Sequence, residues 1–261
     1  MSISIRIENH IAYVALDRAD KRNAISFDML KQLLKAAKSI RANRDVRAII
    51  IHGNGSSFSS GIDLSDLNNT SNRLFAAWQL IKPGQSLFQK AFLTWQKIPV
   101  PVIAVMHGHC LGAGMQLALA ADIRISSADC QCAIMEARWG LVPDMGITQT
   151  LKGLEPIDIA KELTFSARVI SGETAHTLGL VTHISDTPLE AATTLANEFI
   201  NRSPDSLAAS KGVLNAMVFN SKRSAIRLEK ISQLKLVMGK NSTLARKKDK
   251  NPDVEFINRQ R

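Results

Sequence analysis

The sequence predicts an α/β fold built on parallel strands, followed by a region made only of helices. Short β-branched runs, VRAIIIH at 46–52 and VPVIAVMH at 100–107, alternate with stretches of helical periodicity, which is the pattern of βαβ units. Past about residue 203 the strand-like runs cease, and apolar residues recur at helical spacing in SLAASKGVLNAMVF and AIRLEKISQLKLVM. We therefore expect a core over residues 1–202 and a helical C-terminal region over residues 203–261, which packs on the core or on a neighbouring subunit.

The N-terminal elements follow from period-two alternation and from a helix cap. Residues 3–7 and 12–16 alternate between apolar and polar side chains and predict a hairpin. Ser26, with Asp28 close behind it, predicts the start of an amphipathic helix that runs to about Ile40. The run that follows is too uniformly apolar to have a solvated face, so it predicts a strand buried on both sides.

The middle of the chain predicts one long helical segment and two more strands. A loop rich in glycine and serine leads into helical periodicity from about Asn72 to Trp95, with a soft break at Pro83-Gly84. The run at 100–107 and IRISS at 123–127 then predict strands that join the same sheet.

Composition limits the class of protein. The 261 residues are 45% hydrophobic and contain three cysteines, and no apolar run approaches the roughly 20 residues that a membrane span needs. We expect a cytoplasmic protein without a membrane segment. Cys130 and Cys132 have no second pair or nearby histidine, so we expect buried packing there rather than a metal site.

The formal net charge of +10 allows two further interpretations. Lys31, Lys35 and Lys38 would share a helix face, and a basic run spans 246–250, which is compatible with nucleic-acid binding. No zinc-finger or aromatic-interleaved pattern accompanies the charge, so a solvated surface is the preferred interpretation and nucleic acid is not an expected partner. Positive charge also suits a small ligand that carries several phosphates.

Two glycine-rich loops each follow a predicted buried strand. They are HGNGSSFSSGIDLSDL at 52–67 and GHCLGAGMQ at 108–116. Neither has the residue order of a nucleoside-triphosphate loop or of a dinucleotide fingerprint. Backbone N–H groups at the ends of neighbouring parallel strands could converge on one oxygen, as in an oxyanion hole, and tight strand-to-helix turns are the alternative.

Five ordered motifs then identify a family resemblance. They are LDRADKRNAIS at 16–26, SSFSSGIDLSDL at 56–67, GHCLGAGMQLALAADIRIS at 108–126, MEARWGLVPDMGITQTL at 135–151 and ISGETAHTLGLVTHI at 170–184. The chain resembles the crotonase, or enoyl-CoA hydratase/isomerase, superfamily. The resemblance implies a spiral of ββα units with a helical C-terminal trimerisation region, and trimers that often pair as hexamers. It also implies an acyl-CoA substrate, with coenzyme A as part of that substrate and no separate cofactor.

The resemblance assigns roles to particular residues. The backbone N–H groups of Ile62 and Ala113 match the oxyanion hole, which stabilises charge on the thioester oxygen. The matches to the strip that binds coenzyme A are Arg22, Ala24, Ser60, Gly61, Asp63 and Leu64. Ordinary interpretations of some of these remain, since Arg22 is also what a solvated charge looks like and Asp63 what a helix cap looks like. Trp139, Val142 and Met145 are expected to line an apolar acyl pocket.

Three polar residues separate this chain from typical hydratases. Hydratases of the family have glutamate at the positions of Gln116 and Glu136, and the two together move the protons of a water molecule. Here Gln116 cannot accept a proton, whereas Asp144 supplies a carboxyl group where hydratases have glycine. Family members with an acid at this position are mostly double-bond isomerases. Without the resemblance, Glu136 is also consistent with a helix start and Asp144 with an N-cap.

These features predict an enoyl-CoA isomerase in which Glu136 and Asp144 transfer protons. One alternative is an enoyl-CoA hydratase, a lyase, that uses Glu136 with Gln116. The other is a homologue without turnover that binds coenzyme A or RNA.

Overall fold

A six-stranded sheet forms the centre of the molecule. Its strands, in chain order, are β1 (Ile3–Glu8), β2 (Ile11–Leu16), β3 (Ala48–Gly53), β4 (Val102–Met106), β6 (Ile123–Ser126) and β9 (His183–Ile184). The strands lie side by side in that order in the computed structural model, which describes residues 2–154 and 156–260. Only the β1–β2 hairpin is antiparallel, and the other neighbours are parallel. The predicted hairpin and parallel sheet are therefore confirmed.

A second, three-stranded sheet was not predicted. It consists of β5 (His109–Leu111), β7 (Gln131–Ala133) and β8 (Ile170–Ser171). Strands of two or three residues are too short to show a period-two pattern, so the sequence carries little signal for them. This sheet matters for function because β5 leads directly into the second glycine-rich loop.

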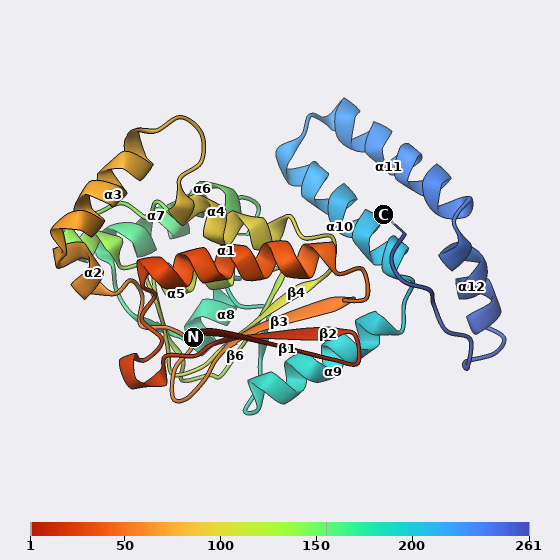
Figure 1. The fold of residues 1–261 in the computed structure, drawn as a ribbon, viewed down its shortest axis with the longest axis horizontal. Coiled ribbons are helices and arrows are strands. Elements are labelled where there is room, and N and C mark those ends of the chain that lie inside the picture. Colours follow the sequence, from red (N-terminus) through yellow and green to blue (C-terminus); the bar gives the residue numbers. More distant parts are fainter. Residues whose placement is uncertain (1, 155, 261) are drawn as a thin grey trace.

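Helices cover both faces of the large sheet (Figure 1). α1 (Phe27–Ala42), α4 (Leu87–Gln96) and α5 (Ala113–Leu119) pack on one face, and α9 (Pro188–Ile200) packs on the other. In β3, Ile49 and Ile51 enter the first core, whereas Ala48 and Ile50 enter the core under α9. Apolar residues on both faces explain the uninterrupted β-branched run in this strand.

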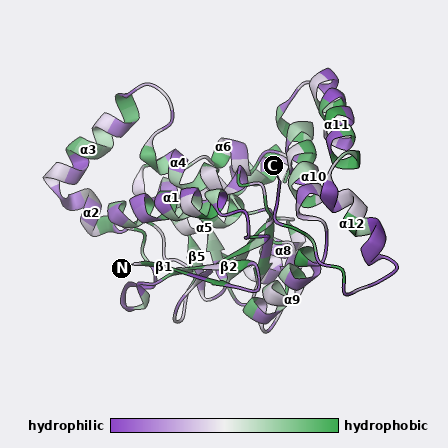
Figure 2. Cartoon of the chain, turned by 45° about the vertical axis from the view of Figure 1, so that its right-hand side comes forward, coloured by the Kyte–Doolittle hydropathy of each residue, from purple (hydrophilic) through white to green (hydrophobic). Residues whose placement is uncertain are grey.

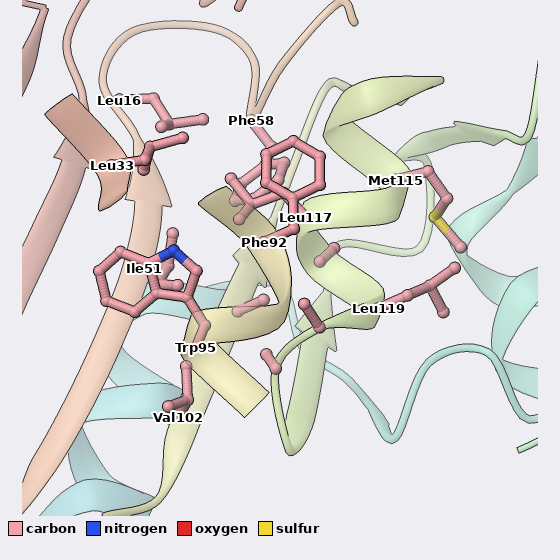
Figure 3. Packing of buried hydrophobic residues seen from close by; sticks show 14 of the residues in the cluster. Leu16, Leu33, Ile51, Phe58, Phe92, Trp95, Val102, Met115, Leu117 and Leu119 are labelled. Atoms are coloured by element: carbon pink, nitrogen blue, oxygen red, sulfur yellow. The ribbon is translucent and has the colours of Figure 1, made fainter. Parts of the chain in front are cut away.

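The larger core is built around aromatic side chains of α4. Figure 3 shows Trp95 and Phe92 packed among side chains from the sheet, from α1 and from α5. Trp95, Phe92 and Phe58 are fully buried. Truncating one of them to alanine would cost about 3–5 kcal/mol of unfolding free energy, so this cluster fixes the position of α5 against the sheet.

The expected helical segment from Asn72 to Trp95 is interrupted at its predicted break, but more completely than expected, because it forms two separate helices. α3 (Thr70–Ile81) follows the short α2 (Leu64–Asn68), and α4 begins only after a loop over residues 82–86. Gly84 in this loop has φ +80°, which a continuous helix cannot contain. Ser86 then starts α4 with a reciprocal pair of side-chain and backbone hydrogen bonds to Gln89. The predicted start of α1 is confirmed, because the Ser26 side chain accepts from Met29 N.

Short helical segments connect the remaining strands. They are η1 (Ala19–Lys21), η2 (Glu136–Trp139), α6 (Ile147–Thr150), α7 (Ile157–Ser166) and α8 (Gly172–Thr177).

Within the described part of the C-terminal region, three helices span most of residues 204–248 and no strand occurs. α10 (Pro204–Phe219), α11 (Lys222–Val237) and α12 (Lys240–Lys248) stand at one end of the sheet (Figure 1). Lys211 of α10 donates to Asp122 Oδ2 at 2.6 Å and to Val100 O at 3.0 Å, which anchors the helix to the core. Residues 1 and 261, the outer ends of the two expected regions, lie outside the described residues.

The last described segment returns to the core. Arg47, which is 8% exposed, donates to Phe256 O at 2.9 Å, and Arg259 donates to Arg41 O at 3.2 Å. The first contact lies directly before β3, and the second lies in the last turn of α1. The last described segment therefore packs on the core of its own chain, which is one of the two arrangements expected for the C-terminal region.

Candidate active site

The two glycine-rich loops meet, as the sequence predicts. Leu111 N donates to Ser59 O at 3.0 Å, and Ser59 N donates to His109 O at 2.8 Å. α5 approaches the first loop so closely that a Cβ on Gly114 would lie 2.7 Å from Ser59 Cβ. Only glycine permits this approach. The ends of β3 and β4 thus bring both loops to one place.

At this meeting point, backbone N–H groups of both loops are left without an acceptor. Those of Gly61 and Asp63 donate to Ser59 Oγ and Ile25 O, and that of Gly112 donates to Ala133 O. Between them, the N–H groups of Ile62 and Ala113 have no hydrogen-bond acceptor among the described residues. Backbone donors seldom stay unpaired away from water, so the pair is suited to an oxygen of a bound molecule.

A cavity of about 420 Å³ opens over these two donors. Its lining is mostly apolar, with the glycine-rich loops on one side and η2 on another. The lining residues are Phe27, Ser60, Gly61, Ile62, Leu64, Ala76, Leu80, Phe88, Gly112, Ala113, Gln116, Met135, Glu136, Trp139, Leu141, Val142, Asp144 and Met145. All three residues expected in the acyl pocket are among them, as are both expected carboxylates.

Besides the hydroxyl group of Ser60, the side chains of Gln116, Glu136 and Asp144 form the polar part of the lining. Gln116 of α5 is 1% exposed, and its Nε2 donates to Glu136 Oε1 at 2.7 Å. Its Oε1 accepts from Met145 N at 3.0 Å. The other carboxylate oxygen of Glu136, Oε2, is buried and has no partner among the described residues. The glutamine therefore links the two segments that carry the carboxylates.

The local structure bears on the two alternative interpretations of these acids. Glu136 is the first residue of η2, so it does begin a short helix. Asp144 does not cap one, because α6 begins at Ile147 with Gly146 at its N-cap and no side-chain cap bond. A carboxylate that lines a cavity without capping a helix is available for chemistry.

Both carboxyl groups are less acidic than in water. Burial raises the pKa of Glu136, and the charge of Asp144 adds to this rise. Hydrogen bonds from its own backbone N–H, from the Gln116 side chain and from the Met135 backbone lower this pKa. Burial also raises the pKa of Asp144. A carboxyl group whose pKa moves toward neutrality can both accept and return a proton.

The residues expected to bind coenzyme A lie in two adjoining segments beside the cavity, residues 22–24 and 60–64. Ser60 N donates to Arg22 O at 2.9 Å, and Ile25 N donates to Gly61 O at 2.7 Å. Ser60, Gly61 and Leu64 line the cavity, but Arg22, Ala24 and Asp63 do not. Arg22 is exposed on the turn that leads to the half-buried Ala24.

Asp63 has structural partners. Its side chain accepts from Ser65 N at 3.0 Å, which caps α2, and it pairs with Arg18 at 2.5 Å. These donors hold the pKa of Asp63 below its ordinary value, against the effect of partial burial. Arg18 also donates to Ala24 O at 3.2 Å. It therefore holds the segments around Ala24 and Asp63 together. Sequence reasoning missed Arg18, because nothing local distinguishes it from an exposed charge.

Within the described residues, no helix has the length and apolar content needed to cross a membrane. The same part of the chain contains no cluster of three or more histidine, cysteine or acidic side chains arranged to hold a metal ion.

Comparison with known sequences gives the same family as the motifs. A family model described as enoyl-CoA hydratase/isomerase matches residues 6–246. The mitochondrial Delta(3,5)-Delta(2,4)-dienoyl-CoA isomerase of Mus musculus is 36% identical over 214 residues, which cover 78% of this chain and 65% of the relative. The mitochondrial methylglutaconyl-CoA hydratase of Mus musculus is 32% identical over 212 residues, covering 78% and 66%. The chain thus spans slightly less than two thirds of the length of either relative.

Solved structures support the fold. A Bacillus anthracis enoyl-CoA hydratase superposes with a TM-score of 0.89 over 99% of both chains at 23% identity, a likeness of fold alone. A Thermobifida fusca YX protein assigned as an enoyl-CoA hydratase, solved in complex with acetoacetyl-CoA, is 30% identical with a TM-score of 0.81. That match covers 90% of this chain and 94% of the other. The predicted crotonase-like α/β fold is confirmed.

Proposed function

Because the chain belongs to the enoyl-CoA hydratase/isomerase family, we propose that it is an isomerase that moves a double bond within an enoyl-CoA thioester. One observation favours isomerisation over hydration. Of the polar side chains that line the cavity, Glu136 and Asp144 are the two carboxyl groups that can exchange protons, while Gln116 is an amide and Ser60 a hydroxyl. A glutamine can orient a group but cannot accept a proton. Moving a proton between two carbons requires one base that can also act as an acid.

The free N–H groups of Ile62 and Ala113 would hold the thioester oxygen. When a proton leaves the carbon next to the thioester, negative charge moves onto that oxygen, and both donors stabilise it. Losing one such donor costs about 3 kcal/mol in comparable sites. The coenzyme A part would lie along Arg22, Ala24, Ser60, Gly61, Asp63 and Leu64. The Thermobifida fusca complex with acetoacetyl-CoA supports this kind of ligand. Coenzyme A is then part of the substrate, and no separate cofactor is needed.

The lining of the cavity indicates an uncharged acyl group. The charged side chains among its lining residues are Glu136 and Asp144, and no lysine, arginine or histidine is among them. An acyl group that carries its own carboxylate would face two acids without a counter-ion, which is unfavourable in a desolvated site. Methylglutaconyl-CoA carries such a carboxylate, so we favour a substrate of the kind that the isomerase relative acts on.

The test compares two reactions of the purified protein. We expect double-bond movement in a 3-enoyl-CoA, followed by coupling to an added hydratase, to be faster than loss of the 2-enoyl absorbance by direct hydration. Methylglutaconyl-CoA serves as the carboxylated control and should be turned over poorly.

Two results would contradict the proposed isomerase activity. Fast hydration with slow isomerisation would assign the alternative hydratase that uses Glu136 with Gln116. No turnover of either thioester, with retained coenzyme A binding or with salt-dependent RNA binding, would assign a binding protein.

We propose further that the chain forms a homo-oligomer, a trimer or a hexamer. None of the described residues of α11 is buried, although this helix carries several large apolar side chains. Leu234 is 61% exposed, and Val237 and Met238 are similarly open. Figure 2 shows hydrophobic segments on α10 and α11. An unpartnered apolar helix face of this size favours contact with another subunit.

Charging this face should separate the subunits. We expect the double variant Leu234→Glu, Met238→Glu to sediment as a monomer where the unmodified protein sediments as an oligomer, because a buried glutamate without a partner is costly. Ser39→Glu, at an exposed position of α1, is the matched control and should leave the sedimentation coefficient unchanged. Identical sedimentation of the double variant would show that α11 is not the interface.

We place the protein in the cytoplasm. Cys110, Cys130 and Cys132 are free and buried, which fits a reducing compartment. The two mouse relatives carry mitochondrial names, so cell fractionation is the measurement that separates the compartments.

A further inference from the structure

The orientation of the Gln116 amide is fixed by its surroundings. The backbone N–H of Met145 can only donate, so the Gln116 atom 3.0 Å away must be the carbonyl oxygen Oε1. The NH₂ group therefore faces Glu136, 2.7 Å from its Oε1. Flipping the amide would set N–H against N–H on one side and oxygen against oxygen on the other. The Met145 backbone thus determines what Gln116 presents to Glu136.

This orientation constrains Glu136 in turn. An amide NH₂ always donates, so Oε1 of Glu136 must always accept. A donor held 2.7 Å from a carboxylate oxygen stabilises the ionised form more than the neutral form. Asp144, in contrast, has no side-chain hydrogen bond to any other described residue. The two carboxyl groups of the cavity are therefore treated differently.

We propose that Gln116 is a positioning residue whose amide, clamped by the Met145 backbone, holds Glu136 as the ionised, proton-accepting carboxylate of the site. This inference rests on the proposed function for its catalytic meaning, since the base matters only if a proton is moved. The resting state of Glu136, however, is a property of the free protein. It can be measured without any substrate.

Among the described residues near Glu136, no buried positively charged side chain stabilises its ionised form. α5, which carries Gln116, has no charged residue. α7 packs against η2 and carries Asp158, Lys161 and Glu162, all exposed. Arg138 of η2 is exposed as well, and Asp144 is the charged neighbour that acts on Glu136 in the opposite sense. Among side chains, the Gln116 amide is therefore the donor that offsets part of the effect of burial on Glu136, alongside the backbone N–H groups of Glu136 and Met135.

Glutamate at position 116 would not do the same. It would set a second carboxyl oxygen 2.7 Å from Glu136 Oε1, and two ionised groups cannot remain at that distance. The two acids would share a proton until the pH is high. Glutamine has the same length and shape but donates without charge at every pH. Glutamine rather than glutamate at position 116 therefore favours the ionised form of Glu136.

The experiment is a ¹³C NMR titration of protein labelled at the glutamate carboxyl carbon. The Glu136 resonance is assigned as the one missing from Glu136→Gln. In Gln116→Met, which has the same length and no donor, we expect the Glu136 midpoint to rise by about one pH unit or more, since charge-assisted hydrogen bonds are of that size. In Gln116→Glu, the midpoint should split into two coupled steps.

Gln79→Met is the matched control. Gln79 is also buried, and its Oε1 accepts from the backbone N–H of Leu87 at 2.8 Å, but it does not line the cavity. This variant should leave the Glu136 midpoint where it is in the unmodified protein. A midpoint that stays unchanged in Gln116→Met, or that moves equally in Gln79→Met, would overturn the proposal.

Kinetics separate this inference from the proposed function. The acid limb of the kcat/KM profile should move to higher pH in Gln116→Met, together with the NMR midpoint, while KM changes little. If the protein proves to catalyse nothing but the midpoint still rises, the positioning role stands and the proposed reaction fails. If isomerisation is found but its acid limb does not follow the NMR midpoint, Glu136 is not the base that Gln116 controls, and the inference fails.

Discussion

Replacing Gly112 with valine should abolish turnover of every acyl-CoA thioester while leaving the protein folded. Gly112 has φ +49° and ψ −116°, a conformation that a β-branched residue does not adopt without strain. A Cβ there would lie 3.4 Å from Glu136 Oε1 and from Met135 Cγ, so the two methyl groups of valine would reach into the cavity. The strain would also move the neighbouring N–H of Ala113, and loss of this donor alone is worth about 100-fold or more in rate.

The control for this prediction is a glycine that also has a positive φ but has open space at its Cβ position. Gly84 has φ +80°, and a Cβ there would meet no atom within 4 Å. Gly84→Val should therefore be strained but active. Circular dichroism and sedimentation should be unchanged in both variants. Unmodified rates in Gly112→Val on any accepted thioester would show that this turn does not bind the reacting oxygen.

Replacing Asp144 with asparagine should lower isomerisation of a 3-enoyl-CoA by at least about 100-fold, because general acid–base groups typically contribute 10²–10⁴. Binding of coenzyme A should change little, since Asp144 is not among the residues expected to bind coenzyme A. Asparagine has nearly the same shape but cannot exchange the proton. Measured kcat should therefore fall much more than KM rises.

The stability of the same variant provides an independent check. Burial raises the pKa of Asp144, so between its unfolded and folded pKa values the folded protein binds more protons than the unfolded chain. The free energy of unfolding then falls as the pH rises through this window. Asparagine removes that cost, so Asp144→Asn should unfold at the same temperature as the unmodified protein or higher at neutral pH. A helix cap would give the opposite sign.

The outcome that contradicts the role of Asp144 is specific. Rapid hydration by the unmodified protein, undiminished in Asp144→Asn, would show that Glu136 works with Gln116 as a hydratase. Asp144 would then have no part in the chemistry.

The elements that sequence reasoning predicted well are those with long or strongly periodic patterns. The buried strand at Ala48–Gly53 and the cap at Ser26 belong to this class, because each leaves a local mark of several residues. The break between α3 and α4 was underestimated, since Pro83-Gly84 ends one helix and the capping box of Ser86 starts another. Two-residue strands such as β9 leave no pattern to read.

The active-site residues divide in the same way. The family resemblance predicted Glu136 and Asp144 as the two carboxyl groups of the site, and the structure places both in the lining of one cavity. The bond between Gln116 and Glu136 joins residues twenty positions apart, and the orientation of its amide depends on Met145 in a third segment. Arg18 pairs with Asp63 across 45 positions. Such contacts are set by tertiary packing, so no local signal in a single sequence reveals them.

The contact between Arg47 and the carbonyl of Phe256 has a consequence for folding during synthesis. Arg47 stands directly before β3 and is nearly buried, yet one of its acceptors lies 209 residues further along the chain. Domains generally begin to fold from the N-terminal side while the ribosome is still extending the chain. A nascent chain that ends before Phe256 leaves this guanidinium without that acceptor, although the strands around it are already complete. The last step in closing this end of the sheet therefore waits until Phe256 has been synthesised.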